Sequence, residues 1–584
     1  MFSLLPAWII IFIGFTFIGA GFTAVIIHGF RKTTAIPLDL FKMFWIGYAV
    51  VVAFLQLYSL LFPVNSKTLA ILTLVSLAAA VYSRKLLKLS LIDILSKIKN
   101  LKLLFWLITS GMVIIIGLFS TLPTTNSDTN LYHLNAVKWA SEYSIVPGLS
   151  NLHGRLGFNS SFLLFGALTN NLNFKDKIVY LCNSTLIFVL VIEWIVAVIS
   201  QFNPNKFFVI LTAPFIVTII ISGHLSSLST DIPAYIFTLL VVKYSIDIDM
   251  YSDKLSDIDA PNIFSLLAVV VTSSLLFTTK LSGAPMSMVG IFVVIFYSRN
   301  NKWLLSTLLV LPLILLLGFF IRNIVLTGWI VYPFPMGNLH LDWSISEKQA
   351  LHEYIVTKSW AKMPGKEWRL VMTNDFMFWF IPWAKRLAAD NLMTLIVFVS
   401  SLTILIINVK NYIRTSLRCH HKFLYISLAI LLCLVYWFLT APDVRFGAPY
   451  FWAFFAIVCC HFMANIYPKS MSNSKKQFIS LAPYLIACVF IFIGLPRDLS
   501  KKLSFVQWSS LTPSMSEPLH IVRIKNGDYP NLEIYKPLNG SFCGNSPLPC
   551  SPYVSQNSKL ALRSPGDLQK GFKHTVTGDE DAFR

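Results

Sequence analysis

The sequence predicts an all-α polytopic membrane protein with about 12–14 transmembrane helices, external loops and a small irregular C-terminal tail outside the cytoplasm. Of its 584 residues, 55% are hydrophobic and only 13% are charged, a more apolar balance than one soluble core requires. Apolar runs of about twenty residues recur along the chain, each long enough to cross roughly 30 Å of hydrocarbon. Because these runs are continuously apolar rather than alternating, they exclude a membrane β-barrel.

The apolar runs give the approximate positions of the spans. The segment 158–168 is too short to cross alone, so we interpret it as a re-entrant or interfacial helix. We expect spans near 4–29, 42–62, 67–83, 103–120, 178–200, 207–222, 232–248, 262–278, 284–298, 303–321, 391–409, 422–440, 448–466 and 478–495.

The basic residues indicate an orientation. The formal net charge is +20, but most Lys and Arg lie in short connections between spans, as the positive-inside rule describes. The charge therefore predicts no nucleic-acid partner. If these connections are cytoplasmic, both termini are extracytoplasmic, and we expect a multipass protein of a bacterial inner membrane.

This orientation divides the chain into alternating membrane and external parts. We expect N-terminal transmembrane helices in 1–120, a first large external loop in 121–177, central transmembrane helices in 178–321, a second large external loop in 322–391, C-terminal transmembrane helices in 392–495 and an external tail in 496–584. Short strands are expected in this tail near 520–524 and 532–535, and its last dozen residues are expected to be disordered.

Two of the eight cysteines differ from the rest in their surroundings. Cys543 and Cys550 lie in a polar, proline-rich stretch, whereas the others lie in or beside apolar segments. A short disulfide between them would close this loop and requires an oxidising compartment. The expected external position of the tail meets that requirement.

The first external loop carries the first candidate reactive residues. Asp128 stands directly after a span, where a short helix is expected to begin with Ser127 or Asp128 as its N-cap and to present His133. The alternative is a structural role, in which Asp128 only caps the helix and the aromatic residues after it lie at the membrane interface. Further along, His153 could exchange a proton near neutral pH, and Arg155 offers a planar fork for phosphate or carboxylate.

Charged and ionisable residues recur at other turns on the same predicted side. Singly, a Lys or Arg at a helix end is often a snorkelling anchor, and an adjacent Asp and Arg can form a local ion pair. Their joint occurrence on one side favours a binding site. These residues are His224, Asp231, Lys280, Arg322, Asp443 and Arg445.

The common nucleotide, metal and hydrolase motifs are absent. The sequence has no Walker loop, HExxH, paired CxxC, GxSxG elbow or dinucleotide fingerprint in a supporting context. It therefore gives no local support for nucleotide-driven transport or metalloprotease chemistry. No cofactor or metal ligand is assigned, and a divalent metal, although chemically possible, has no support in the sequence.

Several segments resemble the GT-C class of membrane glycosyltransferases. They are Asp128 in Asn-Ser-Asp-Thr-Asn-Leu-Tyr-His, Lys280-Leu-Ser, and Arg322-Asn-Ile-Val-Leu-Thr-Gly-Trp-Ile-Val-Tyr-Pro. The chain departs from that pattern because no second acidic residue stands beside Asp128. More closely, it resembles an uncharacterised bacterial envelope family with VPGLxNxHGRLGFNS, APDxRF and PLPCxPY segments.

The GT-C resemblance implies a GT-C-like fold and transfer of a sugar from a polyprenyl-phosphate carrier to an envelope glycan or lipid at the outer face of the membrane. It implies Asp128 as the general base, with His133, His153 and His224 in reserve for proton transfer or phosphate binding. The implied partners are membrane lipid, the lipid-linked sugar and the glycan acceptor. The implied cations for the leaving phosphate are Arg155, Lys280, Arg322 and Arg445.

Two other functions remain open at this stage. A polysaccharide polymerase or ligase also joins lipid-linked glycans outside the membrane, and the long loop 322–391 would suit it. A transporter or flippase of lipid-linked glycans would need charged residues near mid-span and two related halves. Glu193 is the main carboxylate inside a span, and the two halves do not match.

Overall fold

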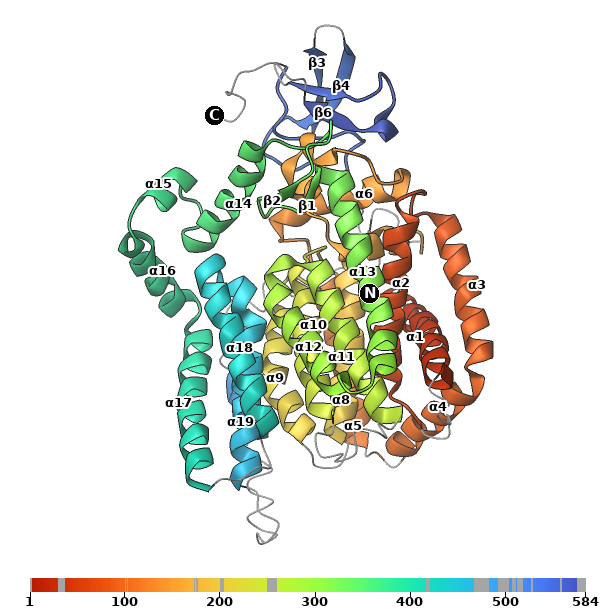
Figure 1. Ribbon diagram of the computed structural model, residues 1–584, viewed down its shortest axis with the longest axis vertical. Coiled ribbons are helices and arrows are strands. Elements are labelled where there is room, and N and C mark those ends of the chain that lie inside the picture. The colour runs from red at the N-terminus through yellow and green to blue at the C-terminus, as the bar shows by residue number, and fades with distance from the viewer. Residues whose placement is uncertain are drawn as a thin grey trace.

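The computed structural model describes residues 3–29, 37–99, 101, 103–172, 174, 177–199, 204–248, 260–415, 421–466, 483–491, 504–506, 511, 518–526, 529–556 and 559–574. This part of the chain is mostly helical (Figure 1). Nine of its helices are long and apolar enough to cross a membrane, or ten if one bent pair counts as a single span. The predicted helical, multispanning class is confirmed to this extent, and the total of 12–14 spans stays a prediction.

The helical bundle follows the apolar runs of the sequence closely. Its bent pair is α3 and α4, which meet at 80°. Of the expected span 478–495, only 483–491 are described, and these are helical. The bundle helices are α1 (Leu4–Gly29), α2 (Leu40–Tyr58), α3 (Ser66–Tyr82), α4 (Arg84–Lys99), α5 (Leu103–Ser120), α8 (Cys182–Ile199), α9 (Pro204–Ile221), α10 (Asp231–Asp247), α11 (Ala260–Thr279), α12 (Ala284–Ser298), α13 (Lys302–Thr327), α17 (Leu392–Thr415), α18 (His421–Thr440) and α19 (Val444–Ile466).

Small residues allow the first two helices to pack closely. A Cβ atom at Gly19 of α1 would lie 1.8 Å from the carbonyl oxygen of Met43, and one at Gly47 of α2 would lie 1.8 Å from that of Phe15. Only glycine fits at either position. Close backbone approach through small residues is a common way for helices to associate in lipid, where the hydrophobic effect gives no net attraction between them.

The short apolar segment after the first loop forms a helix inside the protein. In α7 (Ser161–Thr169) every residue is buried, and the helix packs against α2, α11 and α6 (Leu134–Glu142). It therefore does not lie on the bundle surface as an interfacial helix would. A non-spanning segment at this depth is tolerated because protein, rather than lipid, surrounds it.

The C-terminal tail is more regular than predicted. Two antiparallel hairpins form, one from β3 (Leu519–Asn526) and β4 (Tyr529–Pro537), the other from β5 (Leu560–Leu562) and β6 (Phe572–His574). The expected strands near 520–524 and 532–535 and the Cys543–Cys550 disulfide are present. Residues 575–584, which were expected to be disordered, lie outside the described residues. We call the described residues of 518–574 the C-terminal lobe.

Hydrophobic burial fixes the lobe to the first loop. A cluster separate from the bundle core contains Trp139, Leu149 and Leu152 of that loop together with Ile534 and Phe572 of the lobe. Backbone hydrogen bonds support it, since the amide of Phe572 donates to the carbonyl of Pro147 at 2.9 Å. The lobe covers the loop because both contribute apolar side chains that neither could bury alone.

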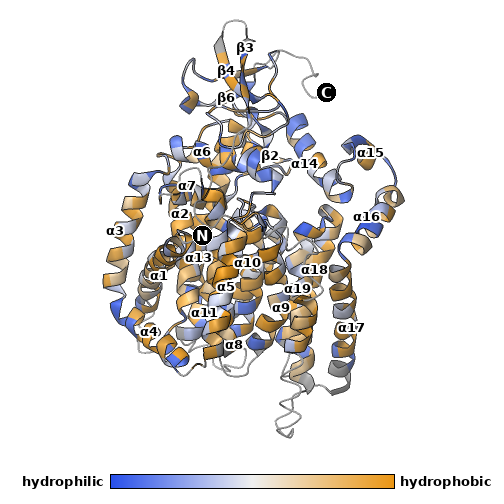
Figure 2. Ribbon diagram, turned by 180° about the vertical axis from the view of Figure 1, so that it is seen from behind, coloured by the Kyte–Doolittle hydropathy of each residue, from blue (hydrophilic) through white to orange (hydrophobic). Residues whose placement is uncertain are grey.

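The polar segments of the chain gather at one end of the bundle. This end carries the C-terminal lobe, the first loop, the hairpin of β1 (Trp329–Val331) and β2 (Met336–Asn338), and the helices α14 (Glu347–Lys362), α15 (Trp368–Thr373) and α16 (Phe376–Asp390). In Figure 1 the C-terminal lobe lies above the bundle, and α14, α15 and α16 lie beside its upper end. Figure 2 shows that the bundle is predominantly hydrophobic and that hydrophilic residues are concentrated near its ends.

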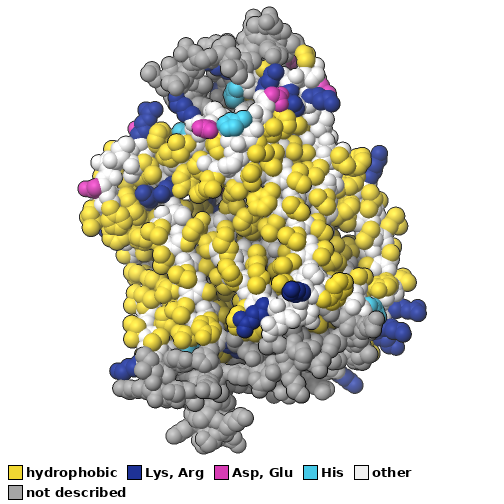
Figure 3. Space-filling model, in the orientation of Figure 1, with side chains coloured by type: hydrophobic (Ala, Val, Ile, Leu, Met, Phe, Trp, Pro, Cys, Tyr) yellow, Lys and Arg dark blue, Asp and Glu magenta, His cyan; other side chains and the backbone are white. Residues whose placement is uncertain are grey.

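Basic residues in the first turns of some helices lie at the opposite end of the bundle. Lys42, near the start of α2, pairs with Asp247 at the end of α10 at 2.8 Å, and Lys422 donates to the carbonyl oxygen of Ile246 at 3.0 Å. Figure 3 shows hydrophobic side chains over a broad middle band, with Lys and Arg mostly above and below it. This arrangement fits the predicted orientation, and the side of the membrane stays a prediction.

Candidate functional site

Asp128 precedes a π-turn at the start of a helical segment. Residues 127–142 are helical, through η1 (Thr129–His133) and then α6. Asp128 makes no capping hydrogen bond; instead, the side-chain oxygen of Asn126 accepts from the amide of Thr129 at 3.0 Å. The prediction that Ser127 or Asp128 caps the helix is therefore wrong. Since Asn126 satisfies the helix end, the carboxylate of Asp128 is available for other partners.

Two guanidinium groups contact the Asp128 carboxylate. Nη1 of Arg155 lies 3.0 Å from Oδ1, and Nη1 of Arg445 lies 3.7 Å from Oδ2. Arg155 comes from the single-turn η3 (Gly154–Gly157), and its guanidinium lies 5.9 Å from the ring centre of Tyr132. The Asp128 side chain remains 23% exposed and that of Arg445 38% exposed. These groups are thus paired with each other but still accessible.

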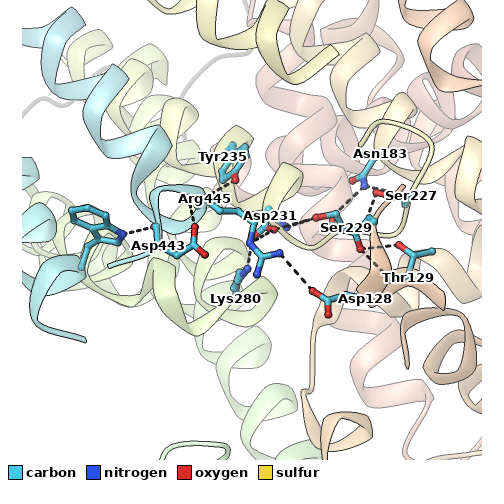
Figure 4. Close-up of polar contacts among 12 residues, drawn as sticks. Asp128, Thr129, Asn183, Ser227, Ser229, Asp231, Tyr235, Lys280, Asp443 and Arg445 are labelled. Carbon is cyan, nitrogen blue, oxygen red and sulfur yellow. Dashed lines mark hydrogen bonds and ion pairs between the residues drawn. The ribbon is translucent and has the colours of Figure 1, made fainter. Parts of the chain in front are cut away.

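Arg445 also joins Asp128 to a second acidic residue (Figure 4). Its Nε lies 3.5 Å from Oδ2 of Asp231, the first residue of α10, while Lys280 pairs with Oδ1 of Asp231. The Asp231 side chain is only 10% exposed. We call Asp128, Arg155, Asp231, Lys280 and Arg445 the ion network. It therefore contains two carboxylates, those of Asp128 and Asp231.

The backbone around Arg445 is held from two directions. The side chain of Asp443 accepts a hydrogen bond from the Arg445 amide at 2.9 Å, and the hydroxyl of Tyr235 donates to the Arg445 carbonyl at 2.6 Å. Tyr235 lies one turn after Asp231 on α10, so the two side chains share a helix face. Asp443 therefore positions Arg445 through its backbone and forms no side-chain ion pair with it in the described residues.

The turn before Asp231 is fixed by buried polar side chains. Nδ2 of Asn183, on α8, donates to the carbonyl oxygens of Ser227 and Ser229 at 2.8 and 3.1 Å. The amide of Leu228 donates to the hydroxyl of Thr129 at 3.1 Å. Because Thr129 directly follows Asp128, these bonds connect the two acidic residues of the ion network through the protein interior, as Figure 4 shows.

His133 lies buried beside the network. Its side chain lacks a hydrogen-bond partner at both ring nitrogens among the described residues, and only 2% of the residue is exposed. Burial lowers the pKa of His133 to about 4, outweighing the opposite effects of Asp128 and Asp231. His133 is therefore neutral near pH 7. Its predicted role in proton transfer is not tested by this arrangement.

Three other candidates are not members of the ion network. His153 is 5% exposed and stacks on Tyr553 of the C-terminal lobe at 5.1 Å, and burial, followed by Arg155, lowers its pKa to about 3. His224 is exposed at the start of the turn that leads to Asp231. Arg322 lies inside α13 and donates to Asn159 and Ser59. The candidate residues expected to form a binding site together thus occupy more than one position.

Glu353 is a neighbour of the network that the sequence interpretation missed. It lies on α14, where a Cβ atom added to Gly154 would come within 2.5 Å of its Oε1. Burial raises the pKa of Glu353, while the charge of Arg155 acts in the opposite direction. Only the length and polarity of the loop 322–391 pointed to this region. Glu353 lies next to Gly154 only because of tertiary packing, which the sequence does not show.

The network offers more cations than carboxylates for a bound anion. Arg155, Lys280 and Arg445 face the two carboxylates of Asp128 and Asp231. In the described residues, no three His, Cys, Asp or Glu side chains gather closely enough to hold a metal ion. The arrangement can place a carboxylate and partly exposed guanidinium groups against one ligand.

Residues 1–452 match the model of a family described as a domain of unknown function (DUF8201), and the chain belongs to that family. The match ends within α19, before the C-terminal lobe. No curated protein and no solved structure matched the chain.

Proposed function

We propose that this chain is a membrane glycosyltransferase that moves a sugar from a polyprenyl-phosphate carrier to an envelope glycan or lipid acceptor at the periplasmic face. The observation that carries the proposal is the partly exposed carboxylate of Asp128 between Arg155 and Arg445. It lies at the polar end of a hydrophobic helical bundle, where a lipid-anchored donor and a water-soluble or lipid-linked acceptor could both reach it.

The reaction needs the two kinds of group that the network combines. Asp128 takes the proton of the acceptor hydroxyl while the hydroxyl oxygen forms a bond to the anomeric carbon of the sugar. The bond between that carbon and the phosphate oxygen breaks, and the phosphate leaves with the electron pair. Arg155, Arg445 and Lys280 stabilise the negative charge that develops on the leaving phosphate.

The ion pairs also suggest how donor binding prepares the base. Each oxygen of the Asp128 carboxylate has a guanidinium partner, Arg155 at Oδ1 and Arg445 at Oδ2. A donor phosphate that attracts Arg155 and Arg445 competes with Asp128 for them. The Asp128 oxygens are then available to the acceptor hydroxyl only when the donor is in place, which limits wasteful reaction without substrate.

The substitution Asp128→Asn tests the proposed base. Lipid-linked and surface glycans of a deletion strain are first compared with those of the parent, and the lipid-linked species that accumulates then serves as donor in a transfer assay with purified protein. We expect Asp128→Asn to slow transfer by about 100- to 10,000-fold. The neighbouring exposed Ser127→Ala is the matched control and should keep the normal rate.

Three outcomes would change the proposal. Transfer at the normal rate by correctly inserted Asp128→Asn would remove the base assignment. An unchanged glycan profile in the deletion strain would remove the transferase and the polymerase together. A ladder of product lengths, instead of one added unit, would favour the polymerase or ligase.

A further inference from the structure

A second polar position lies next to the segment that carries Arg155, since Leu156 and Phe158 of that segment line it. It is a narrow, partly open cavity of about 40 Å³ between α2, α6, α7 and α13. Its lining includes the polar residues Arg322, Ser59, Asn159 and Ser160, and also Trp139. None of the five residues of the ion network lines it.

Arg322 is a buried cation without an anionic partner in the described part of the chain. Only 8% of the residue is exposed. Its Nε donates to Oδ1 of Asn159 at 3.1 Å and its Nη1 donates to the hydroxyl of Ser59. Both acceptors are neutral, no described carboxylate lies within ion-pair distance, and Nη2 has no described acceptor. Burying a charge is unfavourable unless an opposite charge compensates it, so this arrangement favours an anion.

Trp139 also lines the cavity and has a buried donor without an acceptor among the described residues. The residue is 3% exposed, and its Nε1 has no hydrogen-bond partner among the described residues. An indole N–H can only donate. A buried donor without an acceptor is uncommon in folded proteins and usually reflects a missing ligand or water. Arg322 and Trp139 thus lack the same kind of partner, a hydrogen-bond acceptor.

The rest of the cavity is apolar. Most of its remaining lining is made of hydrocarbon side chains, which would contact the non-polar part of a ligand. The apolar lining residues are Ala136, Ala140, Ile145, Val146, Leu149, Leu156, Phe158, Leu163, Leu164 and Leu326.

We propose that this cavity is a phosphate-binding site, in which Arg322 and the Trp139 indole hold the phosphate oxygens and the apolar lining contacts the first carbon atoms of an attached hydrocarbon chain. A guanidinium with free donors suits phosphate because its fork can give two parallel hydrogen bonds. Ser160, which lines the cavity, donates its hydroxyl to the carbonyl of Thr279 at 2.8 Å, one residue before Lys280 of the ion network. The proposal does not depend on Asp128 being a base.

The test is equilibrium binding of farnesyl monophosphate to the purified full-length protein in phosphate-free detergent solution. Because the ion network could also bind this probe, each variant is measured alone and with Arg445→Gln. We expect Arg322→Gln to weaken binding by about 10- to 100-fold in both backgrounds. Trp139→Phe keeps the ring and removes only the donor, and it should weaken binding by about 3- to 10-fold.

Competition with farnesol and with inorganic phosphate identifies the source of the phosphate. If farnesol does not displace bound farnesyl monophosphate, the protein recognises the phosphate. If inorganic phosphate displaces the probe only at a far higher concentration than that of the probe, the natural ligand is a lipid phosphate. If inorganic phosphate displaces the probe at a similar concentration, the natural ligand is a free phosphate. Competition by farnesol equal to that of the phosphate would overturn the proposal.

Two further controls separate binding from folding and from the transfer reaction. Arg322→Lys keeps the charge and should retain part of the affinity if the protein folds normally. Asp128→Asn should leave the Arg322-dependent binding unchanged even if it abolishes transfer. Unchanged affinity in both Arg322→Gln and Trp139→Phe, or loss of the Arg322 effect in the Arg445→Gln background, would refute a separate site.

Discussion

Glu193 lies inside the helical bundle with 2% of its side chain exposed, whereas Asp128 lies at the polar end with 23% exposed. Glu193 accepts hydrogen bonds from Lys243, Tyr244 and Trp45 at 2.8 to 2.9 Å. Asp128 has one close partner, Arg155, and a second cation at 3.7 Å. Glu193 thus has its hydrogen-bond partners within the bundle, whereas Asp128 remains partly accessible to a ligand.

The comparison separates a structural ion pair from a candidate reactive one. A buried carboxylate with three donors is a fixed part of the core, and exchanging its partners would require the bundle to open. An accessible carboxylate can exchange a guanidinium for a substrate. The transport alternative would use Glu193 as its charged mid-span residue, and in this structure that residue is occupied by Lys243.

The largest expected effect comes from Glu193→Gln, which leaves the buried Lys243 without its counter-charge. We expect a loss of about 3–5 kcal/mol in the free energy of unfolding, measured by equilibrium unfolding in mixed micelles. The double variant Glu193→Gln/Lys243→Met removes both charges and should recover much of the loss. An unchanged unfolding midpoint in the single variant would contradict the structural role.

His133 should make stability depend on pH. Its pKa of about 4 in the folded protein is below the ordinary value of 6.5. Between these values the unfolded chain binds a proton that the folded chain does not, so stability falls as the pH is lowered from about 6.5 to about 4. The loss should approach about 3 kcal/mol at the acidic limit.

The substitution His133→Phe should flatten this pH profile, and the exposed His28→Phe should not. Unfolding midpoints measured across the window are the readout. Some dependence should remain because burial also lowers the pKa of His153. An identical slope in the wild type and in His133→Phe would show that His133 is not neutral and buried in solution.

Removing the disulfide should destabilise the C-terminal lobe to a smaller degree. Cys543 and Cys550 are seven positions apart, and closing so short a loop contributes about 2–3 kcal/mol. The variant Cys543→Ser/Cys550→Ser should show faster proteolysis and hydrogen exchange within the C-terminal lobe. The exposed free cysteine variant Cys488→Ser is the control, and equal protection in all three proteins would refute the expectation.

The smallest expected effect is that of Asp128→Asn on stability. Because its ion pairs are partly exposed, we expect a change of about 1 kcal/mol or less in the free energy of unfolding. Equilibrium unfolding beside Ser127→Ala measures it. A loss as large as that of Glu193→Gln would mean that the ion network, like the core pair, is mainly structural.

Much of the fold could be predicted because its signals are local. Apolar runs gave the helices, strand propensity gave β3 and β4, and polar context gave the Cys543–Cys550 pair. The least accurate prediction was the irregular tail, because its order depends on burial against Trp139 and Leu152. The helix cap at Asn126 was also missed, although Asn is a favoured capping residue.

The candidate site could be predicted only in part. Charged residues at turns pointed to Asp128, Arg155, Asp231, Lys280 and Arg445, which the structure brings together. Nothing in their spacing distinguished them from Arg322, which lies in another cavity.

The sequence by itself determined the helical, multispanning class and the residue types available at the polar end, because hydrophobic length and local polarity act within about twenty residues. Only the tertiary structure decided which charges meet. Arg155 reaches Asp128 across 27 positions, and Arg322 reaches Ser59 across 263. Such partners depend on how the helices pack, because packing fixes the side chains in three dimensions.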